Sequence, residues 1–135
     1  MQEFIKHLEE HYKPISEFTE FDWSRTSRYQ ILSEEFIREY QNDVDWVWIS
    51  VIQKLSEDFI REFQHKVYWR NISVFQRLSE DFIREFKDKV DWFSISIYQN
   101  LSEEFIREYQ NEVYWGIYQY IKPYQRNLSE SLKIK

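Results

Sequence analysis

His7, Glu10 and His11 are the residues whose types and spacing come nearest to a catalytic motif. They spell H-x-x-E-H, which puts two imidazoles one helical turn apart, where they bind zinc while the glutamate acts as general base. A zinc hydrolase of this kind also needs a larger fold and a further acidic ligand on a distant helix. A solvated helix near the N-terminus therefore explains the three residues better, and a metal-dependent hydrolase is a remote alternative.

Pairs of acidic residues recur along the chain at Glu34 and Glu35, Glu57 and Asp58, Glu80 and Asp81, and Glu103 and Glu104. If the segments that carry them stack in register, the pairs form two acidic rows that could bind a cation. An arginine follows each pair and offsets its charge, and neither the spacing nor a turn glycine supports an EF-hand. We expect helix starts rather than metal ligands, and no cofactor.

Tryptophan recurs every 23 residues, at Trp23, Trp46, Trp69, Trp92 and Trp115. A row of indoles can stack on bases or hold a peptide, but each of these stands near isoleucine or valine, which is typical of a core position. A net charge of −6 and the absence of a basic stripe argue against a nucleic-acid partner. The tryptophans are predicted to form a ladder in the core.

The acidic pairs and the tryptophans share one period because the sequence consists largely of internal repeats. Self-similarity at such a period is typical of solenoids, in which each repeat buries its apolar face against its neighbours. The sequence predicts a single repeat domain over 1–135, made of a cap with a half repeat at 1–31, repeats at 32–54, 55–77, 78–100 and 101–127, and a tail at 128–135.

The first half of each repeat has the features of a helix. A serine suited to N-capping precedes each acidic pair, at Ser33, Ser56, Ser79 and Ser102. Apolar residues then follow at helical spacing, as in Phe36, Ile37, Tyr40 and Val44. Glu34 precedes Arg38 by four residues, which predicts an ion pair within the helix.

The second half of the repeat allows two interpretations. Asp45 and Asp91 can cap short helices over 46–53 and 92–99. A strand is the alternative, because the phrase of a leucine-rich repeat is matched by Trp92, Ile95, Ile97 and Asn100. The scarcity of glycine and proline favours helices. We therefore predict an all-α solenoid of stacked short helix pairs, with a β/α solenoid like that of leucine-rich repeats as the alternative.

Composition narrows the class of protein further. The 135 residues include no cysteine, which fits a reducing compartment. The N-terminal segment lacks the uninterrupted apolar stretch that a signal peptide contains. No apolar run approaches the ~18 residues that a membrane-spanning helix needs. The sequence predicts a cytoplasmic protein that is neither secreted nor in contact with a membrane.

Two positions that follow each tryptophan vary between repeats, unlike their neighbours. In three successive repeats they are occupied by Val47 and Trp48, Arg70 and Asn71, and Phe93 and Ser94. Core positions do not tolerate such changes in size and polarity, so these six residues are predicted to be exposed on one face, where repeat proteins bind partners. Neutral drift is the alternative, and Trp48 favours binding because tryptophan is enriched at interaction hot spots.

The phrases L-S-E-D/E-F-I-R-E-F/Y and D-W-x-x-I-S-x-x-Q resemble tandem repeats in uncharacterised proteins of giant DNA viruses of amoebae, of the marseillevirus and mimivirus kinds. The resemblance covers about residues 22–113, whereas residues 1–21 and the insertion after Trp115 depart from it. It implies an intracellular viral protein built on a repeat scaffold, in the host cytoplasm or viral factory. It carries no catalytic residue to this chain.

These observations together favour a non-enzymatic helical-repeat scaffold for protein–protein interaction, with an unidentified protein partner. No nucleophile–base pair or glycine-rich phosphate loop points to an enzyme. The alternative is a structural component of the virion or factory that associates with itself, which allows a homo-oligomer.

Overall fold

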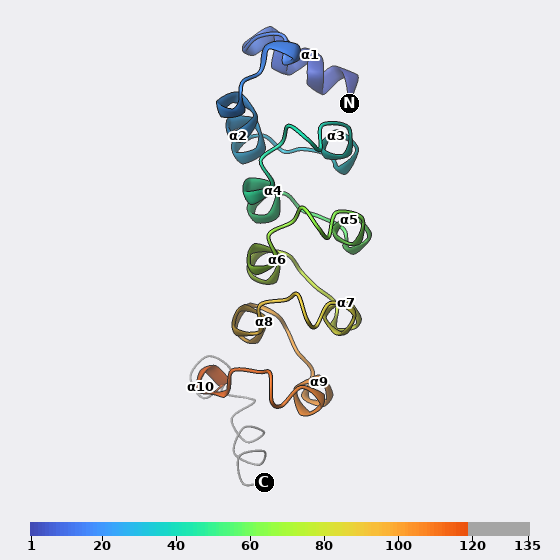
Figure 1. The fold of residues 1–135 in the computed structure, drawn as a ribbon, viewed down its shortest axis with the longest axis vertical. Coiled ribbons are helices and arrows are strands. Elements are labelled where there is room, and N and C mark those ends of the chain that lie inside the picture. The colour runs from blue at the N-terminus through green and yellow to red at the C-terminus, as the bar shows by residue number, and fades with distance from the viewer. Residues whose placement is uncertain (119–135) are drawn as a thin grey trace. The chain divides into compact units, whose positions relative to one another are not determined.

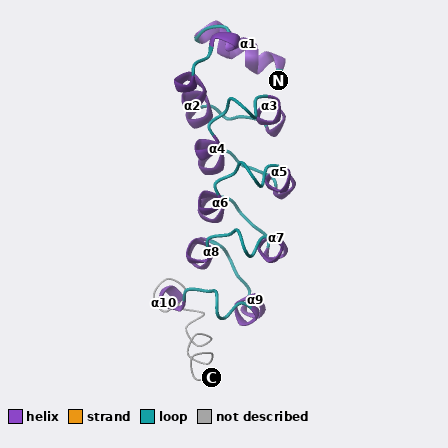
Figure 2. Cartoon of the chain, in the orientation of Figure 1, coloured by secondary structure: helices purple, strands orange, loops and turns teal. Residues whose placement is uncertain are grey.

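A computed structural model describes residues 1–118 of the chain, with side chains through Gly116. The described part consists of helices joined by turns and loops, and no strand occurs within it (Figure 2). The chain divides into an N-terminal unit, Met1–Tyr68, and a C-terminal unit, Trp69–Lys135. The predicted all-α class is confirmed. Residues 119–127 of the fourth predicted repeat and the predicted tail, 128–135, lie outside the described residues.

The N-terminal unit holds α1 (Gln2–His11), the short 3₁₀ helix η1 (Ile15–Glu17), α2 (Glu20–Tyr29), α3 (Glu34–Glu39), α4 (Trp46–Ile52) and α5 (Glu57–Glu62). The C-terminal unit holds α6 (Trp69–Phe75), α7 (Glu80–Glu85), α8 (Trp92–Tyr98), α9 (Glu103–Glu108) and α10 (Trp115–Tyr118). In the first unit α2 packs against α4, and in the second α6 packs against α8 (Figure 1). Within each unit the remaining repeat helices, α3 with α5 and α7 with α9, form a second column (Figure 1).

The second half of the repeat is helical, so the leucine-rich-repeat alternative is wrong. Asp45 caps α4, because its carboxylate accepts a hydrogen bond of 3.0 Å from the backbone N–H of Val47. Ile49 and Ser50 are fully buried, whereas Val47 and Ile52 are exposed. Burial thus follows the helical period, which decides against the two-residue alternation of a strand.

The first half of the repeat is a shorter helix than its apolar pattern suggests. Ser33 caps α3 as predicted, since its hydroxyl accepts a hydrogen bond of 3.1 Å from the N–H of Phe36. The helix ends at Glu39, and the chain then turns, with the N–H of Val44 donating to the carbonyl of Tyr40 at 3.0 Å. The equivalent helices bury the same pair of apolar side chains, namely Phe36 and Ile37, Phe59 and Ile60, Phe82 and Ile83, and Phe105 and Ile106.

A buried serine connects each repeat to the next. The hydroxyl of Ser50 donates to the carbonyl of Trp46 at 2.8 Å and accepts a bond of 3.0 Å from the backbone N–H of Tyr68. The same backbone-to-serine bond recurs from Asp45 to Ser27, from Asp91 to Ser73 and from Tyr114 to Ser96. The serine thereby satisfies a backbone donor in the segment that leads into the following helix.

A buried glutamine forms the second connection. The side-chain oxygen of Gln53 accepts from the N–H of Leu32 at 2.9 Å, and its amide nitrogen donates to the carbonyls of Ser27 and Gln30 at 3.1 and 2.8 Å. Gln99 repeats this arrangement in the C-terminal unit. Three otherwise unpaired backbone groups are satisfied by one side chain, which fixes the chain between α2 and α3.

The tryptophan ladder is less deeply buried than predicted. Trp23 is buried, but the tryptophans of the four later repeats are half-buried. The indole of Trp46 packs on the rings of Phe59 and Phe63, with centroid distances of 6.3 and 5.1 Å, while its N–H donates to the carbonyl of Gln41 at 2.9 Å. One ring face therefore covers the core, and the polar edge lies over the turn that precedes α4.

Candidate functional site

The side of α2 and α4 that faces away from the core carries more apolar surface than folding requires. Phe21 is 72% exposed on α2, and Val47 on α4 is exposed beside the half-buried Trp48. A helix that packs on one side only normally presents polar residues to water. Contiguous exposed apolar side chains in a soluble domain indicate a binding surface.

Phe21 and Trp48 line a hollow of about 490 Å³. We call it the aromatic hollow, and it is lined by Tyr12, Phe21, Ser24, Arg25, Arg28, Tyr29 and Trp48. The guanidinium of Arg28 lies 4.2 Å from the ring centre of Trp48 and 5.0 Å from that of Tyr29, and Arg25 lies 5.4 Å from Tyr12. Each arginine of the lining therefore lies over at least one of its aromatic rings.

Neither arginine of the aromatic hollow forms an ion pair with a carboxylate within residues 1–118. Other arginines do, since Arg38 pairs with Glu62 at 2.7 Å. Two uncompensated cations therefore stand at the hollow of a protein whose net charge is −6.

The pairing of Arg38 corrects one sequence prediction. Its guanidinium reaches Glu62 of the next repeat instead of Glu34 in its own helix, and the bond holds the pKa of the Glu62 carboxyl below its ordinary value. The predicted pair four residues apart does form in the fourth repeat, between Arg107 and Glu103 at 2.6 Å. Arg38 can therefore pair with a carboxylate of the neighbouring repeat in place of the carboxylate four residues earlier in its own helix.

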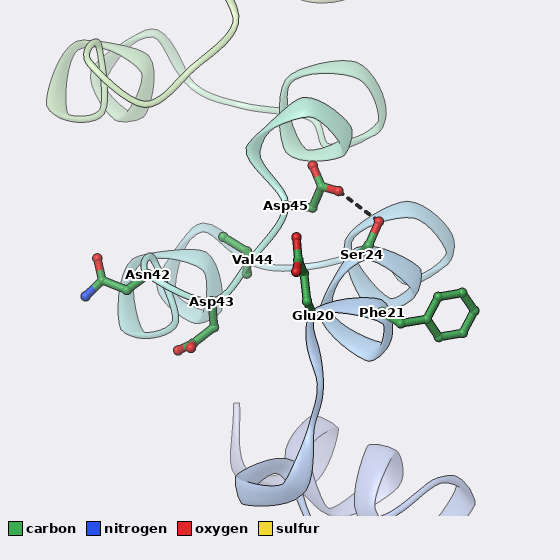
Figure 3. Close-up of a pocket in the computed structure, with 7 residues that line it drawn as sticks. All are labelled: Glu20, Phe21, Ser24, Asn42, Asp43, Val44 and Asp45. Atoms are coloured by element: carbon green, nitrogen blue, oxygen red, sulfur yellow. Dashed lines mark hydrogen bonds between the residues drawn. The ribbon is translucent and has the colours of Figure 1, made fainter.

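A second hollow of about 700 Å³ adjoins the first and shares Phe21 and Ser24 with it. We call it the acidic pocket, and its other lining residues are Glu20, Asn42, Asp43, Val44 and Asp45 (Figure 3). The hydroxyl of Ser24 donates to Asp45 at 2.8 Å, which joins α2 to the start of α4 (Figure 3). The surface therefore changes sign across α2, from two arginines to three carboxylates.

A capping box sets the start of α2 and so the position of both hollows. The carboxylate of Asp22 accepts from the backbone N–H and the hydroxyl of Thr19, each at 2.7 Å, and pairs with Lys13 at 2.8 Å. These bonds, that of Lys13 first, hold the pKa of Asp22 far below its ordinary value of 3.8. The cap lies outside the repeat pattern, and sequence analysis did not find it.

We expect Asp22→Asn to lower the midpoint of thermal unfolding at pH 7, because the variant loses the ion pair with Lys13. The folded pKa of Asp22 is depressed, so its stabilisation is full above the unfolded pKa and declines as the pH falls through and below 3.8. The difference in midpoint between wild type and variant should therefore shrink from pH 7 to pH 3. A difference that grows on acidification would contradict this.

The six residues predicted to bind a partner do not share one environment. The first variable position is exposed in each repeat, as predicted for Val47, Arg70 and Phe93. The second is half-buried at Trp48 and Asn71, and Ser94 is only 2% exposed. The prediction of exposure is wrong for Ser94, because its hydroxyl and N–H both bond to the capping carboxylate of Asp91. Trp48 lies beneath Arg28 and still lines the aromatic hollow.

A more regular set of exposed residues was not predicted from the sequence. The sixth residue after each of the first four repeat tryptophans is apolar or aromatic and between 50% and 65% exposed, at Tyr29, Ile52, Phe75 and Tyr98. Core spacing does not account for it, since the helix already buries the third and fourth residues after the tryptophan. The sequence signal for these residues is an apolar side chain that recurs at the same exposed position of the repeat. Variation between repeats does not reveal such a position.

The H-x-x-E-H residues occupy ordinary helical contacts at the end of α1. A ring nitrogen of His11 lies 2.9 Å from the carbonyl oxygen of His7, to which it donates, and Glu10 lies 3.7 Å from the ammonium of Lys6. Within residues 1–118, no three histidine, cysteine or acidic side chains converge on a point that could hold a metal ion.

The first of the two acidic rows connects neighbouring repeats. Glu34 accepts a bond of 2.6 Å from the N–H of Ser56, the N-cap residue of the next helix of its column. Glu80 accepts the equivalent bond from Ser102. These carboxylates satisfy backbone donors at the helix starts, which explains their recurrence.

Each helix in the described part of the chain is too short or too polar to cross a lipid bilayer. Comparison with protein-family models, with curated proteins and with solved structures finds no match to this chain. Function is therefore inferred from the geometry and charge of its own surface.

Proposed function

We propose that this protein is a non-enzymatic interaction module that binds another protein through the aromatic hollow and the exposed side of α2 and α4. The observation that carries the proposal is the grouping of exposed Phe21 and Tyr29 around a hollow floored by Trp48. Tyrosine, tryptophan and arginine dominate the binding energy of protein interfaces, and they dominate this lining.

The hollow is open to solvent, which favours a segment of a partner over a small cofactor, because cofactor pockets bury most of the ligand's surface. About 490 Å³ of open surface receives a few side chains, while the rings at its rim remain available to an extended backbone. Ser27 of α2 bonds to Asp45 and Gln53 at the two ends of α4, so the surface is formed before the partner arrives. From the resemblance to repeats of giant viruses, we propose that binding takes place in the host cytoplasm or viral factory.

We expect selection from a random peptide display library on the immobilised full chain to yield ligands that depend on this surface. Phe21→Ser and Tyr29→Ser should each weaken the selected peptides about tenfold or more, as truncation of a hot-spot ring does. Ile31→Ser is the matched control, because Ile31 is 93% exposed but lines neither hollow, and it should bind as wild type does. Affinities are measured by fluorescence anisotropy.

Two outcomes would contradict the proposed function. One is the failure of the wild-type protein to enrich any peptide, and the other is equal binding by wild type and both ring variants.

Self-association is the second candidate, and the exposed rings of Phe75 and Tyr98 in the C-terminal unit favour it. Like the N-terminal surface, they remain accessible to a second copy of the chain. Light scattering over a range of protein concentrations separates the two, since a mass that stays monomeric throughout contradicts self-association.

A further inference from the structure

We infer that the aromatic hollow accepts an acidic peptide segment, in which a carboxylate adjoins an apolar side chain. The inference rests on the proposed function and specifies the chemistry of the partner. Arg25 and Arg28 would bind the carboxylate, and Phe21, Tyr29 and Trp48 would cover the apolar neighbour.

The two guanidinium groups are placed to receive an anion. Both lie over aromatic rings, Arg28 over those of Trp48 and Tyr29 and Arg25 over that of Tyr12. Stacking uses the faces of a guanidinium and leaves its in-plane N–H donors available, and that fork matches a carboxylate in a bidentate geometry. The rings also restrict the arginine side chains, so less conformational entropy is lost when an anion binds.

Charge complementarity supports the same partner. Within residues 1–118 no carboxylate pairs with Arg25 or Arg28, although carboxylates outnumber cations along the chain. Asp22, three residues before Arg25, is already bonded to Lys13 and Thr19. A carboxylate supplied by a partner would therefore complete pairs that the described residues leave open.

The adjoining acidic pocket decides between a peptide and a nucleic acid. Aromatic rings with arginines also suit a single strand of nucleic acid, whose bases stack while its phosphates pair. Such a strand carries a negative charge at every nucleotide, and Glu20, Asp43 and Asp45 lie just across Phe21 and Ser24. Repulsion there opposes a continuous polyanion but not a peptide whose negative charge is confined to the aromatic hollow.

The test uses the full chain and three fluorescent peptides that differ only in the residues flanking a central phenylalanine: two glutamates, two glutamines or two lysines. The glutamate peptide should bind about tenfold more tightly than the glutamine peptide, as expected for charge-assisted hydrogen bonds, and lose affinity with added salt. Arg25→Gln and Arg28→Gln should each remove about that tenfold advantage, while Arg28→Lys should retain part of it. Arg77→Gln, which removes an exposed arginine outside both hollows, should change nothing.

Circular dichroism melting of each variant verifies that the helices remain folded. The inference is overturned if the glutamate peptide fails to bind, if all three peptides bind alike, or if a labelled oligothymidylate binds more tightly than the glutamate peptide. The proposed function is tested by a different result. Peptides selected by display that are not acidic but still require Phe21 would support the interaction module and contradict its specificity for acidic segments.

Discussion

Phe59→Ala is expected to lower the free energy of unfolding by about 3–5 kcal/mol, the usual cost of removing a buried phenylalanine from a packed core. Its ring is fully enclosed and lies 4.6 Å from the ring of Phe63 and 6.3 Å from that of Trp46. The substitution leaves a cavity between α4 and α5 and also removes the surface on which the indole rests. Urea denaturation followed by circular dichroism measures the loss.

Phe21→Ala is the matched control for that experiment, since the same side chain is removed from a position largely open to water. Its effect should stay within about 0.5 kcal/mol of wild type. Equal destabilisation by the two alanine variants would contradict the placement of Phe59 in the core and of Phe21 at the exposed surface.

Gln53→Ala is expected to cost about 3 kcal/mol, although it removes no large apolar group. The N–H of Leu32 and the carbonyls of Ser27 and Gln30 lose their side-chain partner, and each unsatisfied buried group costs about 1–3 kcal/mol before water or local rearrangement compensates. Hydrogen exchange followed by NMR should show that the Leu32 amide exchanges faster in the variant, in addition to the loss of global stability.

The control is Gln110→Ala, which removes the side chain of an exposed glutamine. It should leave both the unfolding free energy and the exchange of Leu32 close to the wild-type values. If the Leu32 amide exchanges at the wild-type rate in Gln53→Ala, the proposed role of the glutamine in holding that segment is wrong.

The helices could be predicted from the sequence because their signals are local. Ser33 as a cap, Phe36 and Ile37 as an apolar pair, and Asp45 as a second cap each act within one turn of the chain. Ser50 and Gln53 carry no such signal, since a polar residue in a helix usually faces water. Tyr68, which donates to Ser50, and Ser27 and Gln30, which accept from Gln53, belong to neighbouring repeats. The burial of the serine and the glutamine therefore becomes evident only once the register of the stack is known.

The candidate site was predicted in part for a similar reason. The variation among Val47, Arg70 and Phe93 correctly indicated exposure, because packing restricts size only where neighbours surround a side chain. The same reasoning is wrong for Ser94, where a small polar residue fits beside a capping carboxylate. The aromatic hollow could not be predicted, because Tyr12 and Phe21 belong to the N-terminal region, where the repeat pattern gives no register.

The serine that joins successive repeats has a consequence for how such a chain changes length. Its hydroxyl accepts from a main-chain N–H, so the donating residue can be aspartate, as at Asp45 and Asp91, or tyrosine, as at Tyr68 and Tyr114. The bond does not depend on the side chain it reaches. Duplication or deletion of one whole repeat would therefore bring another backbone N–H to the same serine hydroxyl. The number of repeats could change during evolution without further substitutions at the contacts between repeats.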